Sequence, residues 1–97
     1  MRIIWSSSGW ADVERLYAFL AEYDLTAANA VFDQLVRAPE RLLRFPRIGQ
    51  RLSEFETPEV RELRIGKYVL RYQLLESDIM VLRFFHSREN RFWDPEE

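Results

Sequence analysis

Apolar positions in the first half of the chain follow the period of an α-helix. Between residues 10 and 20 they recur every three or four residues, and a second stripe of the same period runs from 27 to 36. The first stripe consists of Trp10, Val13, Leu16, Tyr17 and Leu20, and the second of Ala27, Ala30, Val31, Leu35 and Val36, with Phe32 beside it. Two helices joined by the short turn at 22–25 are expected to pack antiparallel.

The ends of these helices are marked by polar residues and a proline. Serines occupy positions 6–8, and we expect one of them to cap the first helix by accepting a free backbone N–H. Thr26 is the expected cap of the second helix. Pro39 cannot donate a backbone hydrogen bond, so it predicts a kink or break, followed by a short helix over residues 40–45.

The second half of the chain carries the pattern of β-strands. Runs at 60–65, 68–75 and 79–86 are rich in apolar and β-branched residues, and a short β-prone run covers residues 2–5. Only Gly66 and Lys67 separate the first two runs, which is typical of a type II′ hairpin. The last run is apolar on both faces and is expected to lie at the centre of the sheet. Residues 50–59 read as a loop with room for one short strand.

Helices followed by strands predict an α+β fold, in which an N-terminal strand and a helical hairpin accompany an antiparallel β-sheet. The hairpin would cover one face of the sheet and leave the other face partly open. We expect this open face to be the functional surface. The length of 97 residues indicates a single domain over residues 1–97.

Composition narrows the function classes further. The chain has no cysteine and one histidine, and no carboxylate pair stands at a familiar ligand spacing, so we expect no metal site and no cofactor. The formal net charge of −2 counts against a dedicated nucleic-acid binder. No apolar run approaches the ~20 residues that span a bilayer, and the N-terminus lacks the features of a signal peptide. We therefore expect a cytoplasmic protein that does not enter a membrane.

Three motifs, in order along the chain, resemble those of the RelE/ParE superfamily of toxins. They are the turn Phe45-Pro46-Arg47-Ile48-Gly49, the hairpin from Val60 to Tyr72, and the closing strand from Ile79 to Arg88. The resemblance extends from Ile3 to Arg91 and is closer to ParE than to RelE. It implies the toxin of a type II toxin–antitoxin pair, with the α+β fold predicted above.

The resemblance also implies partners. ParE-like toxins are held to inhibit DNA gyrase without known catalytic chemistry, whereas RelE-like toxins cut mRNA in the ribosomal A site. Both kinds are neutralised by a cognate antitoxin whose C-terminal segment folds onto the toxin. For this chain the resemblance implies a cognate antitoxin, DNA gyrase as the target by analogy, and contact with operator DNA only through the antitoxin.

An mRNA interferase is the main alternative, because RNA cleavage needs a base, an acid and a cation for the phosphorane charge. Residues 60–91 contain seven basic and four acidic side chains. The set that would serve cleavage is His86, Arg83, Arg61, Arg71 and Arg88. His86 is more simply a structural histidine at the end of a strand. Phe92 and Trp93 stand where RelE-like members carry a tyrosine, and Lys67 is the single lysine. These departures favour a binding protein, and an inactive relative that only binds its antitoxin stays open.

Two sets of residues are candidates for binding. Alternation places Arg71 with Val69 and Gln73, and Arg83 with Ile79, Val81 and Phe85; an arginine on such an apolar face needs an acidic partner or an exit to solvent. The candidates for target binding are Arg64, Arg83, His86, Arg88 and Trp93.

Apolar side chains in the N-terminal half exceed the needs of one thin core. The expected antitoxin-binding residues are Trp5, Trp10, Val13, Tyr17, Phe32 and Leu35. An exposed apolar surface of this kind is a liability in a free protein. Homodimerisation through the same surface is the competing explanation.

Overall fold

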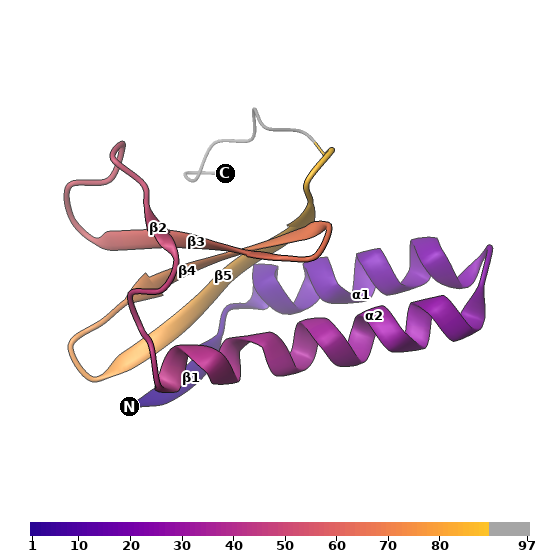
Figure 1. Cartoon of the computed structure of the whole chain (residues 1–97), viewed down its shortest axis with the longest axis horizontal. Helices are drawn as coiled ribbons and strands as arrows, with labels where there is room; N and C mark the ends of the chain where they lie inside the picture. Colours follow the sequence, from indigo (N-terminus) through magenta and orange to yellow (C-terminus); the bar gives the residue numbers. More distant parts are fainter. Residues whose placement is uncertain (90–97) are drawn as a thin grey trace.

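The computed structural model describes residues 1–89, in which a helical hairpin covers one face of a five-stranded sheet (Figure 1). The elements are β1 (Arg2–Trp5), α1 (Ser7–Ala21), α2 (Leu25–Arg37), the 3₁₀ helix η1 (Ala38–Leu43), β2 (Gln50–Arg51), β3 (Glu59–Ile65), β4 (Tyr68–Leu74) and β5 (Asp78–His86). The strand order is β1-β5-β4-β3-β2, which confirms that β5 is central. The α+β class is confirmed as well.

One part of the predicted sheet was wrong, because the sheet is mixed and not purely antiparallel. Strand β1 pairs with β5 in parallel, whereas β2, β3, β4 and β5 pair antiparallel in sequence. Parallel neighbours need a long connection between them, and the helical hairpin and the meander supply it. Local patterning cannot reveal this direction, because it depends on which edge of the sheet β1 joins.

The helix ends follow the expected chemistry with one exception. Ser6 caps α1, since its Oγ accepts a hydrogen bond from the backbone N–H of Gly9 at 2.9 Å. The cap of α2 is Asp24 and not Thr26: the Asp24 carboxylate accepts from the N–H of Ala27 at 3.0 Å. The turn is shorter than expected, so Thr26 already lies inside the helix. The α-helix ends at Arg37, just before Pro39, as expected. The 3₁₀ helix η1 follows directly and has Pro39 in its first turn.

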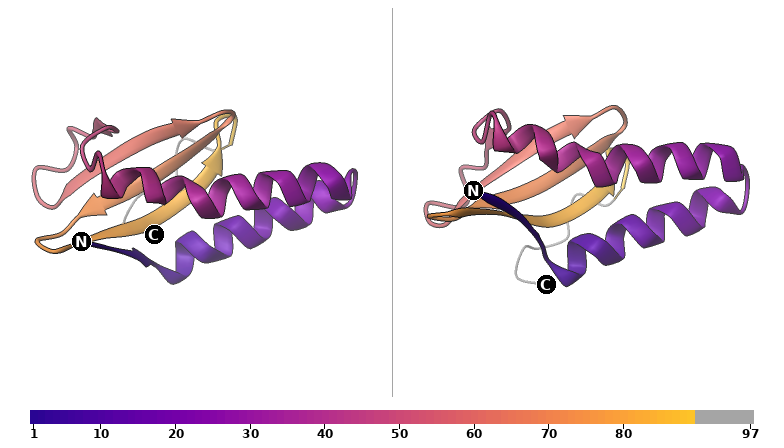
Figure 2. Two further views of the ribbon diagram at one scale, coloured as in Figure 1. Left: turned by 60° about the horizontal axis from the view of Figure 1, so that its bottom comes forward. Right: turned by 90° about the horizontal axis from the view of Figure 1, so that it is seen from below.

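The core lies between the hairpin and the sheet, and both helices run along the same face of the strands (Figure 2). The side chains that are fully buried there are Val13 from α1, Leu35 from α2, Leu42 from η1, and Leu70, Tyr72, Ile79, Val81 and Phe84 from the sheet. The buried side chains of β4 and β5 are all large. Together they form a continuous apolar surface against which the helical hairpin packs.

A register shift in the centre of the sheet changes which side chains of β5 share a face. Tyr72 lies opposite Val81, but Arg71 lies opposite Arg83, so Leu82 is an extra residue in β5. Before this β-bulge Ile79 and Val81 share the sheet face of Tyr72; after it Arg83 lies opposite Arg71 on the other face, and its guanidinium still reaches Asp12 of α1. The prediction that Arg83 shares a face with Ile79 and Val81 was therefore wrong, because simple alternation does not survive a bulge.

The tight connection between β3 and β4 has the expected geometry. Gly66 has a φ of 61°, and no residue other than glycine in the described part of the chain has a positive φ. Positive φ at the first central position alone is the mark of a type II′ turn. In residues 1–89 no helix is long and apolar enough to cross a membrane.

Candidate functional site

Four aromatic side chains form a continuous row along β1 and the helical hairpin, which we call the aromatic row: Trp5, Trp10, Phe32 and Tyr17. Ring centroids lie 5.3 Å apart between Trp5 and Trp10, 6.0 Å between Trp10 and Phe32, and 5.7 Å between Phe32 and Tyr17, all in edge-to-face arrangements. Trp10 is 39% exposed and the other three are partly exposed. Such a row combines a large apolar area with rigid side chains, which suits a docking surface.

Two residues predicted to bind the antitoxin do not belong to this surface. Val13 and Leu35 are both completely buried in the core. Both residues belong to the apolar stripes of their helices. At these two positions the stripe is covered by the core and leaves no exposed surface. The four members of the aromatic row remain candidates for this contact.

Arg83 is held by the buried carboxylate of Asp12 in α1. Its Nε and one terminal nitrogen donate to the two carboxylate oxygens at 2.7 and 3.1 Å. The same carboxylate accepts the backbone N–H of Phe84 at 2.9 Å. The hydrogen bonds to Asp12 raise the pKa of Arg83 above its ordinary value. Of the two fates expected for Arg83, pairing with an acid is therefore the one found.

The Asp12–Arg83 pair lies just beyond the end of β1. From this point on, the edge of β5 has no strand partner, because β1 pairs only with residues 78–81. Beside it, the Ser6 hydroxyl donates to the carbonyl of Leu82 at 2.9 Å, and the Ser6 N–H donates to that of Val81 at 3.0 Å. The start of α1 thus satisfies backbone groups that β1 does not reach. Arg83 has a structural role at this junction.

Arg71 and Arg64 lie on the sheet face that the helices leave uncovered. Arg71 donates to the carboxylate of Glu62 on β3 at 2.8 Å, and its guanidinium lies 5.9 Å from the centre of the Phe85 ring. Arg64 is exposed at the end of β3. The open face therefore holds paired charges together with at least one exposed cation.

Arg61 belongs to a separate charged network at the start of β3. Glu59 accepts from Arg61 at 2.7 Å and from Arg47 at 3.1 Å. Arg61 also donates to the carbonyl of Gly49 at 2.7 Å. Hydrogen bonds from Arg47 and Arg61 lower the pKa of Glu59 below its usual value. The network fastens residues 47–49 to the sheet.

The lowered pKa predicts a pH-dependent contribution to stability. A carboxylate with a folded-state pKa below its unfolded-state pKa stabilises the protein above the unfolded value, and this contribution disappears as pH falls through the folded value. Glu59→Gln should therefore destabilise the protein at pH 7 and approach the wild type below pH ~4. Thermal melts across this range measure the difference. The exposed Glu54→Gln serves as control, and an equal deficit for Glu59→Gln at every pH would contradict the assignment.

His86 has the contacts of a structural histidine. Its Nδ1 accepts the backbone N–H of Arg88 at 3.0 Å, and its ring meets that of Tyr68 edge-to-face at 5.3 Å. Its backbone N–H donates to Glu89 at 2.7 Å. Burial raises the pKa of the Tyr68 phenol, which leaves that hydroxyl protonated at neutral pH. These contacts hold the end of β5 in place.

The five residues considered for RNA cleavage do not gather on one face. Register places Arg61 opposite Tyr72 and His86 opposite Tyr68, on the helix-facing side, whereas Arg71 and Arg83 occupy the other side. Arg88 is exposed beyond β5. Cleavage needs its base, acid and cation around one phosphate, and this arrangement separates them.

The remaining predicted target-binding residues have mixed placements. Arg64 and Arg88 are exposed, Arg83 and His86 are engaged in the contacts described above, and Trp93 lies outside the described residues. Across residues 1–89 no group of three or more histidine or acidic side chains is placed to hold a metal ion.

Sequence reasoning missed two residues that organise these surfaces. Asp12 stands inside the apolar stripe of α1, and an acid in that position signals a buried partner. The second is Tyr72, whose hydroxyl accepts the N–H of Gly49 at 3.0 Å and donates to the carbonyl of Pro46 at 2.7 Å. Nothing in the local pattern reveals this long-range contact.

Comparisons with known proteins find relatives in sequence and in fold. The model of a family described as the ParE toxin of the type II toxin-antitoxin system parDE matches residues 3–91. The protein called Toxin RelE1 from Caulobacter vibrioides is 34% identical over 84 residues, which cover 82% of this chain and 86% of that protein. A solved structure titled a chromosomal ParDE TA system from P. aeruginosa has a TM-score of 0.74 at 19% identity, covering 89% of this chain and 95% of that one. At this identity the structural likeness shows the fold.

Proposed function

Because the chain belongs to the ParE toxin family of type II toxin–antitoxin systems, within the RelE/ParE superfamily, we propose that it arrests growth by binding a cellular target. By family analogy the target is DNA gyrase, and a cognate antitoxin neutralises the toxin. Family analogy suggests the target, and the placement of the candidate catalytic residues supports action by binding.

A binding mode of action is supported by the way the candidate catalytic residues are engaged. The guanidinium of Arg83 is committed to Asp12, and Arg61 is committed to Glu59. His86 uses Nδ1 in a local backbone contact. With the set divided between both faces of the sheet, the described surface offers contacts for a partner but no assembled site for phosphodiester cleavage.

The observation that carries the antitoxin partnership is the aromatic row. Its members present adjoining, partly exposed rings, and an amphipathic antitoxin helix would bury them by aligning its apolar side chains along the hairpin. The solved structure of similar fold is titled a ParDE system, and this supports an antitoxin as the occupant.

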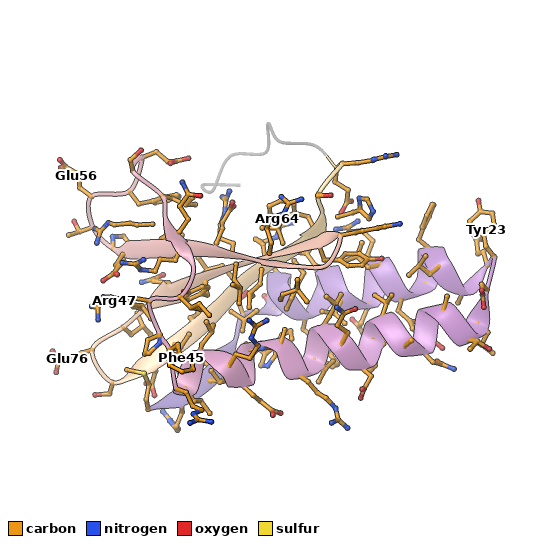
Figure 3. The ribbon with its side chains drawn as sticks, viewed as in Figure 1. Tyr23, Phe45, Arg47, Glu56, Arg64 and Glu76 are labelled. Carbon is orange, nitrogen blue, oxygen red and sulfur yellow. The ribbon has the colours of Figure 1, made fainter. Side chains whose placement is uncertain are left out.

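Replacing the most exposed ring of the row should weaken this complex. Trp10→Ala removes a side chain that touches both Trp5 and Phe32, and truncation of such a central anchor costs at least about tenfold in affinity. Titration with the purified cognate antitoxin measures the effect. Tyr23→Ala is the matched control, because Tyr23 is 76% exposed and lies at the tip of the hairpin (Figure 3). Unchanged affinity for a folded Trp10→Ala variant would remove the row from the interface.

The target is tested with purified gyrase. We expect the toxin to inhibit supercoiling of relaxed plasmid, and we expect equimolar antitoxin to restore it. We also expect mRNA to stay intact in a translation reaction that contains the same toxin. Codon-specific cuts in that mRNA, with supercoiling unaffected, would contradict the proposal and support the interferase.

A further inference from the structure

The turn that follows η1 exposes apolar side chains on a rigid support. Leu43, Phe45 and Ile48 are 46%, 58% and 44% exposed. Residues 44–48 line a shallow, open hollow of about 500 Å³. We call this surface, made of residues 41–48, the turn surface. Exposed apolar clusters of this kind mark interaction sites in folded proteins.

The turn surface is held in place from beneath by the sheet. The buried hydroxyl of Tyr72 bridges the carbonyl of Pro46 and the N–H of Gly49, and Arg61 donates to the Gly49 carbonyl. At Gly49 the backbone lies so close to β3 that an added Cβ would come within 2.7 Å of the Glu62 carbonyl oxygen. The turn therefore loses little conformational freedom when a partner binds, which favours affinity.

The charge of the segment that carries the turn surface indicates the chemistry of its partner. Residues 37–51 hold five arginines and one acidic residue, Glu40, a net charge of +4. Arg37 and Arg47 pair with Asp33 and Glu59. Within residues 1–89, the exposed Arg41 and Arg44 form no ion pair. Two free cations beside three apolar side chains match a surface that carries carboxylates around apolar contacts.

The opposite end of the molecule has the opposite character. Residues 16–36 hold Glu22, Asp24 and Asp33 and no basic residue. Figure 3 shows Tyr23 at the hairpin tip and Phe45 in the other half of the molecule, where Glu56 and Glu76 are labelled as well. The hairpin tip thus lacks the arginines with which an acidic partner can pair at the turn surface.

From these observations we infer that the turn surface is the part of this toxin that docks on its cellular target, and that the target presents an acidic protein surface with apolar side chains. This inference rests on the proposed function, because it takes the chain to act by binding. Two of the three exposed apolar side chains are aliphatic. Aliphatic groups do not stack on bases, so the surface favours a protein over a nucleic acid.

The test introduces negative charge on the turn surface. Phe45→Glu/Ile48→Glu replaces two exposed apolar side chains with carboxylates that repel an acidic partner. We expect the double variant to need at least about tenfold more protein than the wild type for the same growth arrest. We also expect it to keep wild-type affinity for the cognate antitoxin, which proves that it folds. The matched control is Tyr23→Glu/Leu25→Glu at the hairpin tip, which should arrest growth like the wild type.

Four other outcomes would each overturn the inference. Growth arrest by the folded double variant at wild-type levels would remove the turn surface from target binding. A parallel loss of antitoxin affinity, by a double variant with the thermal melt of the wild type, would make the turn surface part of the antitoxin interface. Binding of a labelled DNA or RNA fragment that the double variant loses would make the partner a nucleic acid. Self-association of the toxin that Phe45→Glu/Ile48→Glu abolishes would make the partner a second copy.

These outcomes are distinct from failure of the proposed function. A wild-type chain that arrests no growth contradicts the proposed function, and the inference with it. A wild-type chain that arrests growth, beside a double variant that does so equally, contradicts the inference alone.

Discussion

Asp12→Ala should destabilise the protein far more than an alanine substitution at any exposed position of α1. The change leaves the Arg83 guanidinium without its carboxylate and the Phe84 N–H without its acceptor, in a place where the Asp12 side chain is only 6% exposed. Removing one partner of a buried ion pair costs 3–5 kcal/mol, and because Arg83 is 28% exposed we expect about 3 kcal/mol. Chemical denaturation of the purified protein measures this free energy of unfolding.

Two further variants show whether the loss of stability comes from the Asp12–Arg83 pair. The exposed Glu14→Ala in the same helix should change stability by no more than about 0.5 kcal/mol. The double variant Asp12→Ala/Arg83→Ala should lose less stability than the two single variants together, since the second substitution removes the guanidinium that Asp12 binds. A strictly additive double variant would show that the two side chains do not act as a pair.

Gly49→Ala should have the second largest effect, through the turn surface. The added Cβ would lie 2.7 Å from the carbonyl oxygen of Glu62 and 2.8 Å from the Tyr72 hydroxyl. Neither atom can move freely, because the first belongs to the backbone of β3 and the second bridges Pro46 and Gly49. We expect a loss of about 2–3 kcal/mol of stability, in the range of overpacked cores.

Hydrogen exchange of the backbone amide at position 49 gives a second measurement for Gly49→Ala. The hydrogen bond from the Gly49 N–H to Tyr72 should lengthen or break, and its amide should then exchange faster with solvent. Gln50→Ala, at the neighbouring exposed position, is the control and should leave both stability and exchange unchanged. Wild-type stability for Gly49→Ala would mean that the turn has more room than the close approach to β3 indicates.

Much of the fold could be predicted from the chain, because each element carries its own local signal. The two helical stripes, the serine cap, the break at Pro39 and the Gly66 turn all depend on residues close together in sequence. The parallel direction of β1 and the bulge at Leu82 could not be predicted. Both arise from contacts between segments far apart in the chain, where periodicity holds no information.

The candidate site was harder to predict than the fold. Partly exposed aromatics such as Trp10 were found from composition, but the same reasoning assigned the buried Val13 and Leu35 to the surface. Exposure within one helical stripe depends on the angle at which the helix meets the sheet, and sequence alone does not set this angle. The partners of Arg83 and Tyr72 lie 71 and 26 residues away, so their roles appeared only in three dimensions.

We expect this toxin to act by binding a target in DNA replication and not by cleaving RNA. The most direct measurement is pulse labelling of DNA and protein synthesis side by side, after the toxin is expressed without its antitoxin. If the toxin binds a replication target, thymidine incorporation stops first, while amino-acid incorporation continues and cells filament. Collapse of amino-acid incorporation within the first minutes, with DNA synthesis still running, would contradict it.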